Sequence, residues 1–377
     1  MESPISYFSG LADPRIDRTK AHLLDDIIFI AIASVLCGAD TWDDMEDFGK
    51  AKLSWLKTFL KLPEGIPSHD TFNRVFSLLD PKKLGDCFLQ WTRAVFRTTK
   101  GEVISIDGKT ICGSRDKGKK SIVHMVSAWA EVNNIVLGQL KVNDTCAAQS
   151  ASKSNEITAI PELLKLLVLK GCIVTIDAMG CHVCCAKCKQ KEIASQIISQ
   201  EADYVFALKG NQGNLLQQTE DSFRFLPVKS VSEKIDADHG RVERRVCSVI
   251  DDLSMIEARE DWKNLQSIVR VEAERYTSYF VQSTSMKSTG KSETETRFYV
   301  SSLPADAELL NKSIRSHWRI ENSLHWILDV AFNEDNSRKR AGNAAQNFSV
   351  LNRIALNMLK NDKSTKRGIL VLRTKYE

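Results

Sequence analysis

The stretch Val103-Ile104-Ser105-Ile106-Asp107-Gly108-Lys109 organises the interpretation of the whole chain. Its first four residues favour a short β-strand. Asp-Gly favours a turn, so the pattern predicts that the strand ends there and leaves Asp107 at its carboxyl end, beside the crevice of the sheet. The alternative is an ordinary turn without a function.

A second stretch ends in the same way. Cys172-Ile173-Val174-Thr175-Ile176 reads as a buried strand, and Asp177 follows it directly. Asp177 could equally cap a following helix. Two carboxylates at strand ends nevertheless indicate a candidate site at one edge of a sheet.

A third carboxylate lies in a predicted helix from Glu308 to Phe332. Residues at helical spacing form one apolar stripe that we expect to face the core: Leu310, Ile314, His317, Glu321, Leu324, Leu328 and Ala331. A glutamate on a buried face must be paired, neutral or bound to a cation. Glu321 could therefore be neutralised by Arg315 or Arg319. Together with Asp107 and Asp177, it could instead hold two divalent metals over a phosphodiester.

The composition is that of an ordinary globular protein with two or three domains. The chain has 377 residues, of which 43% are hydrophobic and 27% charged, and its net charge is +4. This mild positive charge is compatible with a polyanionic partner without requiring one. The first residues lack the pattern of a secretory leader, and the longest apolar run, Ile27 to Leu36, is too short to span a bilayer, so we expect a cytoplasmic protein.

Residues 1–98 are predicted to form a helical N-terminal domain that is compatible with DNA binding. The expected helices are His22 to Gly38, Trp42 to Leu60, one capped by Ser68, and Lys83 to Phe96. Lysines and arginines on these helices suit a nucleic-acid partner. They could also serve solubility alone.

Residues 99–224 are predicted to form the first part of a mixed α/β core of the ribonuclease-H type. Strands are expected at Val103 to Ile106, Ile122 to Val132, Ile135 to Leu140, Cys172 to Ile176 and Tyr204 to Leu208, with a turn at Asn133-Asn134 and helices at Ile157 to Leu169 and Lys191 to Gln200. Residues 225–303 read as a β-rich insertion. Residues 304–377 return to the core with the helix of Glu321, a last helix from Ala344 to Leu359, and a basic tail.

Two other metal sites are compatible with the sequence. Cys181, Cys184, Cys185 and Cys188 form two abutting pairs, whereas zinc ribbons separate their pairs by a dozen or more residues. His317, Glu321 and His325 recur at four-residue steps and could share one metal on a helix.

Several side chains could contact nucleic acid. Arg241, Glu243 and Arg245 share one face of a strand and could form a phosphate clamp or a self-paired edge. Trp318 and Trp326 are interpreted as core anchors rather than as stacking platforms for bases.

The motifs taken together resemble the DDE transposases of bacterial insertion sequences, specifically the H-repeat-associated group. The resemblance extends nearly from end to end and is carried by Gly65 to Phe72, Ile106 to Lys109, Lys153 to Pro161, Thr175 to Cys181, Ala207 to Gln212, His239 to Arg245, His317 to Asn322, Leu324 to Trp326 and Asp329-Val330.

The resemblance implies a ribonuclease-H-like core in which Asp107, Asp177 and Glu321 hold two Mg²⁺ or Mn²⁺ ions. The implied activity is phosphodiester cleavage at the ends of the element and strand transfer to target DNA. The implied partners are the terminal inverted repeats, the target DNA and further copies of the chain in a homodimer or larger synaptic assembly, with nucleoid association when bound. The cations expected at DNA phosphates are Lys109, Lys209, Arg241, Arg245 and Arg319.

The chain departs from the family pattern in two respects. Ile314, His317 and Leu328 occupy places where related groups often carry Tyr, Arg and Lys, so those roles are not carried over. Thr145 to Ser152 and His182 to Lys189 are insertions, and the second lies close to Asp177. We therefore expect a weak or inactive transposase. The alternatives are a catalytically impaired DNA-binding remnant and a nuclease relative without strand transfer.

Overall fold

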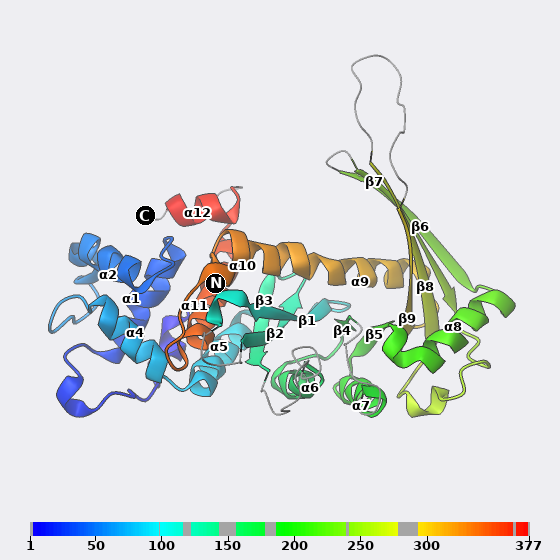
Figure 1. Cartoon of the computed structure of the whole chain (residues 1–377), viewed down its shortest axis with the longest axis horizontal. Helices are drawn as coiled ribbons and strands as arrows, with labels where there is room; N and C mark the ends of the chain where they lie inside the picture. Colours follow the sequence, from blue (N-terminus) through cyan, green and yellow to red (C-terminus); the bar gives the residue numbers. More distant parts are fainter. Residues whose placement is uncertain are drawn as a thin grey trace, which may run out of the picture. The chain divides into compact units, whose positions relative to one another are not determined.

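The computed structural model describes residues 3–97, 99–115, 122–142, 156–177, 186–238, 241–277, 293–364 and 367–375 (Figure 1). The chain divides into two compact units. The first comprises Met1–Arg97, Asp107–Val168 and Arg319–Glu377, and the second comprises Thr98–Ile106 and Leu169–Trp318. Strand β1 (Val103–Ile111) contributes its beginning to the second unit and its end to the first.

The first unit is mainly helical. Its helices are α1 (Leu24–Leu36), α2 (Trp42–Ala51), α3 (Leu53–Leu56), α4 (His69–Leu78), α5 (Pro81–Val95), α6 (Glu156–Leu166), α10 (Trp326–Val330), α11 (Ala344–Asn361) and α12 (Ile369–Lys375). The predicted cap of α4 is confirmed, because the Ser68 hydroxyl accepts a hydrogen bond from the Thr71 N–H. The single helix predicted from Trp42 to Leu60 is wrong, since Lys52, with φ −102° and ψ 16°, separates α2 from α3.

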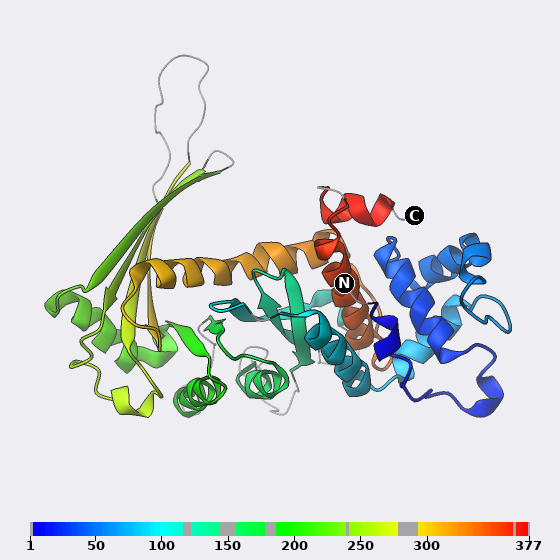
Figure 2. The same cartoon turned by 180° about the vertical axis from the view of Figure 1, so that it is seen from behind.

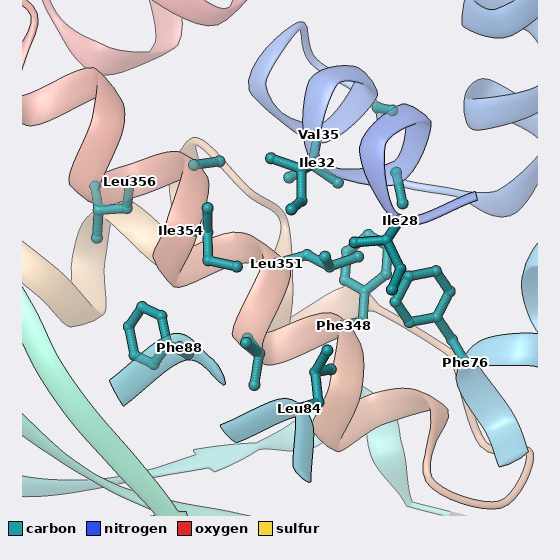
Figure 3. Close-up of a cluster of buried hydrophobic side chains, with 14 of the residues drawn as sticks. Ile28, Ile32, Val35, Phe76, Leu84, Phe88, Phe348, Leu351, Ile354 and Leu356 are labelled. Carbon is teal, nitrogen blue, oxygen red and sulfur yellow. The ribbon is translucent and has the colours of Figure 1, made fainter. Parts of the chain in front are cut away.

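The N-terminal helices and helix α11 share one hydrophobic core (Figure 3). Ile28, Ile32 and Val35 from α1 meet Leu351 and Ile354 from α11, and all five are buried. Phe76, Leu84, Phe88, Phe348 and Leu356 complete the part of this cluster that Figure 3 labels. Residues near the two ends of the sequence therefore depend on the same apolar contacts.

Strands β2 (Val123–Ala130) and β3 (Ile135–Lys141) form an antiparallel hairpin in the first unit. The predicted turn is confirmed: Asn134 has a positive φ of 52°, a conformation that asparagine tolerates better than most residues. The strand order in this unit is β3-β2-β1.

The second unit contains most of the sheet. Its strands are the start of β1, β4 (Ile173–Ile176), β5 (Asp203–Leu208), β6 (Ser230–Asp238), β7 (Arg241–Ile250), β8 (Ser267–Thr277) and β9 (Glu293–Ser301). The order is β1-β4-β5-β9-β8-β7-β6. The β1, β4 and β5 strands run parallel, whereas every later pairing is antiparallel.

Helices α7 (Ala186–Ser199), α8 (Gly213–Phe225) and α9 (Ala307–Ile320) complete the second unit (Figure 2). Leu310 and Ile314 of α9 pack with Val249, Val269 and Val271 on one face of β7 and β8. On the other face, Phe223 of α8 meets Phe298 of β9. The two faces of these strands are thus covered by different helices.

The predicted mixed α/β class is confirmed. The order β3-β2-β1 in one unit and β1-β4-β5 in the other, with antiparallel pairing in the first and parallel pairing in the second, is that of a ribonuclease-H-like sheet. The domain limits at residues 98, 224 and 303 stay predictions.

Candidate metal centre

Asp107 lies inside a strand and not at its end, so the predicted position is wrong in this respect. Strand β1 continues through Asp107, Gly108 and Lys109 to Ile111. The parallel ladder with β4, however, ends at the pair Ile106 and Ile176. Asp107 therefore follows the last rung of that ladder, while the strand itself remains extended.

Gly108 is required here by close packing and not by a turn. A Cβ atom at this position would overlap the side chains of Glu156 and His124, so only glycine lets β1 pass so close to them. The His124 Nε2 lies 2.6 Å from the Glu156 carboxylate, and its Nδ1 lies 2.8 Å from the Thr110 hydroxyl. The glycine thus accommodates a compact polar group next to Asp107.

Glu321 begins a π-helical turn, Glu321–His325, that joins α9 directly to α10. A π turn holds one residue more than an α-helical turn and changes the faces on which the following residues lie. The Glu321 side chain is 55% exposed, so its predicted place on the buried stripe is wrong, whereas Leu324 and Leu328 are buried as expected. Arg319 pairs with Glu131, and Arg315 pairs with Glu243.

Asp107, Glu321 and His325 form a cluster in the first unit. One ligand atom from each lies within 4.8 Å of the others. The Nδ1 atom of His325 is 3.5 Å from the Asp107 carboxylate and 3.4 Å from the Glu321 carboxylate. His325 is buried, and its Nε2 makes no hydrogen bond with any residue in the described part of the chain.

Burial raises the pKa of the Asp107 carboxyl to about 6. His325 and the Gly108 N–H lower this pKa, while the negative charges of Glu321 and Glu156 raise it. Two carboxylates facing each other at partial burial are costly to ionise without a cation. The donor set, two carboxylates beside one imidazole, therefore fits a divalent metal ion.

Asp177 ends the described part of its segment in the second unit, directly after β4. Its carboxylate lies 2.7 Å from the Lys209 ammonium, which follows β5. In the same unit, Thr175 Oγ1 lies 3.0 Å from His317 Nδ1. The group of possible metal ligands in the described residues contains His325 but not His317, the other histidine considered for a shared metal.

The other predicted DNA contacts occupy different surroundings. Lys109 is buried, and its ammonium lies 2.6 Å from Asp329 and 3.1 Å from Asp335. Arg245 is buried next to Glu243, whereas Arg319 is largely exposed. The Arg241 side chain lies outside the described residues, as do Thr145 to Ser152, the start of the second insertion and the cysteine side chains proposed for zinc.

The sequence interpretation did not single out His124 and Glu156. Glu156 belongs to the Lys153 to Pro161 motif, and this motif could have identified it as a candidate site residue. No sequence pattern identifies His124 as a candidate site residue, because it meets Glu156 only where β1 passes at Gly108. Trp326 was expected in the core but is 60% exposed, so that interpretation is wrong.

A family model described as "Transposase DDE domain" matches residues 98–358, and one described as "DDE_Tnp_1-associated" matches residues 5–92. The chain is 42% identical to "Putative transposase YncI" of Escherichia coli O157:H7, over 98% of this chain and 90% of that protein. It is 39% identical to "H repeat-associated putative transposase YhhI" of Escherichia coli K12, over 97% and 92%.

Among solved structures, the chain is similar to a chain in "Cryo-EM structure of piggyBac transposase synaptic complex with hairpin DNA (SNHP)". The TM-score is 0.46 and the identity 11%, over 100% of this chain and 77% of that one. No described helix is long and apolar enough to cross a membrane.

Proposed function

Since the chain belongs to the DDE transposase family, we propose that Asp107, Asp177 and Glu321 hold the divalent metal ions with which it cuts DNA. The observation that carries this proposal is the cluster of Asp107, Glu321 and His325. Asp107 pays an electrostatic cost for its burial, and a bound cation would remove that cost.

The register of the sheet supports Asp177 as the third ligand. Ile106 pairs with Ile176 in the second unit, and Asp107 and Asp177 are the next residues along their respective strands. Lys209, which now pairs with Asp177, would have to yield this carboxylate to a metal ion. Its ammonium would then be available to a DNA phosphate.

The proposed ions are two Mg²⁺, which Mn²⁺ can replace. When bound, they would activate the attacking hydroxyl and stabilise the leaving oxygen of a phosphodiester. The residues of the chain itself hold the ions and orient the groups around them. Asp107 and Glu321 would hold the ions from a strand and a helix, and His325 would orient both carboxylates through its buried ring.

The proposed reaction is in-line attack by water at the end of the element, followed by attack of the freed 3′-hydroxyl on target DNA. We assign end recognition to residues 1–98 and phosphate contacts to Lys209, Arg241, Arg245 and Arg319. The buried Lys109 is instead held by Asp329 and Asp335. Strand transfer requires both ends, so the active form would be a synaptic assembly of several copies, acting on the nucleoid in the cytoplasm.

The test is cleavage of a labelled duplex that carries the end of the element, with the full-length chain. We expect weak cleavage with Mg²⁺ and none with EDTA. The variants Asp107→Asn, Asp177→Asn and Glu321→Gln should lose at least about a hundredfold in rate while retaining DNA binding, because binding rests on phosphate contacts. Glu46→Gln, a change of a helix carboxylate that pairs with Lys50 and lies outside the proposed site, is the matched control.

Equal loss of binding and cleavage in all three variants would show that these carboxylates are structural. A wild-type protein that binds the ends but cuts nothing would support the impaired remnant. Cleavage without joining would support a nuclease that lacks strand transfer.

A further inference from the structure

A cavity of about 120 Å³ lies in the second unit between strands β7 to β9 and helix α9. None of its lining residues belongs to the carboxylate cluster, which is part of the first unit. The residues that line it are Glu243, Arg245, Val271, Ala273, Arg275, Glu295, Arg297, Tyr299, Ile314, Arg315 and Trp318. This volume is roughly that of four water molecules in the liquid, so it suits a small polar group.

The strand period explains why the cavity is charged. Alternate residues of a strand point to the same face, so Val269, Val271, Ala273 and Arg275 of β8 all face helix α9. At the Val269 end the neighbours on β7 are Cys247 and Val249, and the face forms an apolar core. At the Arg275 end, charged side chains replace the apolar ones, and the core opens into the cavity.

The lining carries more positive than negative charge. Four arginines face two glutamates, which leaves an excess of two positive charges. Arg275 lies 3.4 Å from Glu295 and 3.8 Å from Glu243, and Arg315 lies 3.6 Å from Glu243. These separations are longer than that of a charge-assisted hydrogen bond, so the guanidinium groups retain donors for another anion.

The surroundings of Arg245 independently support the binding of an anion in the cavity. Its side chain is only 7% exposed, yet its Nη2 makes no hydrogen bond with any described residue, although Glu243 and Asp236 lie 3.2 and 3.5 Å away. A buried guanidinium donor without an acceptor is costly. An anion in the cavity would provide the acceptor.

Trp318 fixes the plane of one more arginine. The guanidinium carbon of Arg297 lies 4.0 Å from the centre of the indole ring, and Arg297 also pairs with Glu295 at 2.6 Å. Stacking limits the side-chain freedom that Arg297 would lose on binding a ligand, and a planar guanidinium suits the two oxygens of a phosphate.

We propose that this cavity binds one phosphodiester of the DNA backbone through Arg245, Arg275, Arg297 and Arg315, with Trp318 holding Arg297 in place. The inference rests on the proposed function, because DNA supplies the phosphate. A whole nucleotide does not fit, since pockets for ligands of that size measure roughly 300 Å³ or more. The role is to hold the DNA by its backbone, independently of sequence.

The experiment measures binding of a labelled duplex carrying the end of the element, by the full-length chain in EDTA, over a range of salt concentrations. The variants are Arg297→Gln, Arg315→Gln and the double variant. Both arginines are partly exposed, so neither change should prevent folding, which a thermal melt verifies. Arg270→Gln is the matched control, because Arg270 lies on the opposite face of β8 and also pairs with a glutamate.

The cavity holds one phosphodiester, so its loss in the double variant should lower the slope of log affinity against log salt by about one, and Arg270→Gln should leave the slope unchanged. Arg297→Lys should retain the slope but bind more weakly, because lysine cannot make the bidentate contact. An unchanged slope in the double variant, an equal loss in the control, or no DNA binding by the wild type would overturn the proposal. Since binding is measured without metal, failure of Mg²⁺-dependent cleavage would count against the carboxylate site alone.

Discussion

At the scale of single residues, Asp107 has the properties of a functional group that the fold does not need. It is mostly buried and close to two other carboxylates, Glu321 and Glu156. Its pKa of about 6 lies above the ordinary value of 3.8, so the folded protein favours the protonated form. The free energy of unfolding of the metal-free protein should therefore fall as the pH rises from about 4 to about 6.

Asp107→Asn should consequently stabilise the metal-free protein at pH 7. A pKa difference of about two units corresponds to at most about 2 to 3 kcal/mol. The gain should disappear near pH 3, where the carboxyl is protonated in both the folded and the unfolded state. Urea unfolding in EDTA at the two pH values measures it. A variant that is less stable than the wild type at pH 7 would mean that Asp107 has a structural role.

Lys109 illustrates the opposite case, a charged residue on which the fold depends. Replacing it by methionine leaves Asp329 and Asp335 close together without their shared cation. We expect Lys109→Met to lower the free energy of unfolding by roughly 2 to 3 kcal/mol, somewhat less than a fully buried pair because both carboxylates are partly exposed. Lys50→Met removes an ion pair between a solvent-exposed lysine and Glu46 on α2 and should cost much less. Equal effects of the two changes would contradict this view of Lys109.

At the scale of elements, the π turn Glu321–His325 sets the geometry of the candidate site. It places two of the three clustered side chains on one short segment between α9 and α10. Single π turns inside α-helices are often found at functional sites, where one extra residue redirects the side chains.

Deleting Asn322 should convert this turn to a regular α-helical one. Asn322 is exposed, so the apolar contacts of Leu324 and Leu328 can be kept, and stability should change by no more than about 1 kcal/mol. Glu321 and His325 would no longer approach Asp107 together, and cleavage should fall at least about a hundredfold. Asn322→Ala retains the chain length and is the control. Full activity of the deletion variant would exclude a role for the turn.

The π turn and strand β1 also show what cannot be predicted from the sequence. Periodicity predicts the strands, the cap at Ser68 and the helix that bears Glu321, because these depend on local propensity and on the burial of apolar side chains. It does not predict the π turn or the continuation of β1 through Asp107-Gly108. The first inserts one residue into an otherwise regular pattern, and the second depends on Glu156 and His124, which lie far along the chain.

At the scale of the molecule, the shared core of the first unit determines what can fold alone. Leu351 of α11 is fully buried among side chains of α1, α4 and α5, so residues 1–98 lack part of their core when isolated. Residues 1–98, to which we assign end recognition, are therefore not an independent domain. DNA binding should be measured on the whole chain.

Leu351→Ala should lower the free energy of unfolding by about 2 to 5 kcal/mol through the lost apolar contacts and the cavity left behind. Leu78→Ala, the same change at an exposed position of α4, should cost under about 1 kcal/mol. Urea denaturation followed by circular dichroism gives both values. Similar costs at the two positions would contradict the shared core.

The most direct test of the metal centre is the binding of Mn²⁺, followed by electron paramagnetic resonance in the absence of DNA. The wild type should bind Mn²⁺, and Asp107→Asn and Glu321→Gln should each weaken binding at least about tenfold, or about 1.4 kcal/mol. Glu46→Gln should bind as the wild type does. Unchanged Mn²⁺ affinity in both site variants would contradict the assignment of Asp107 and Glu321 as metal ligands.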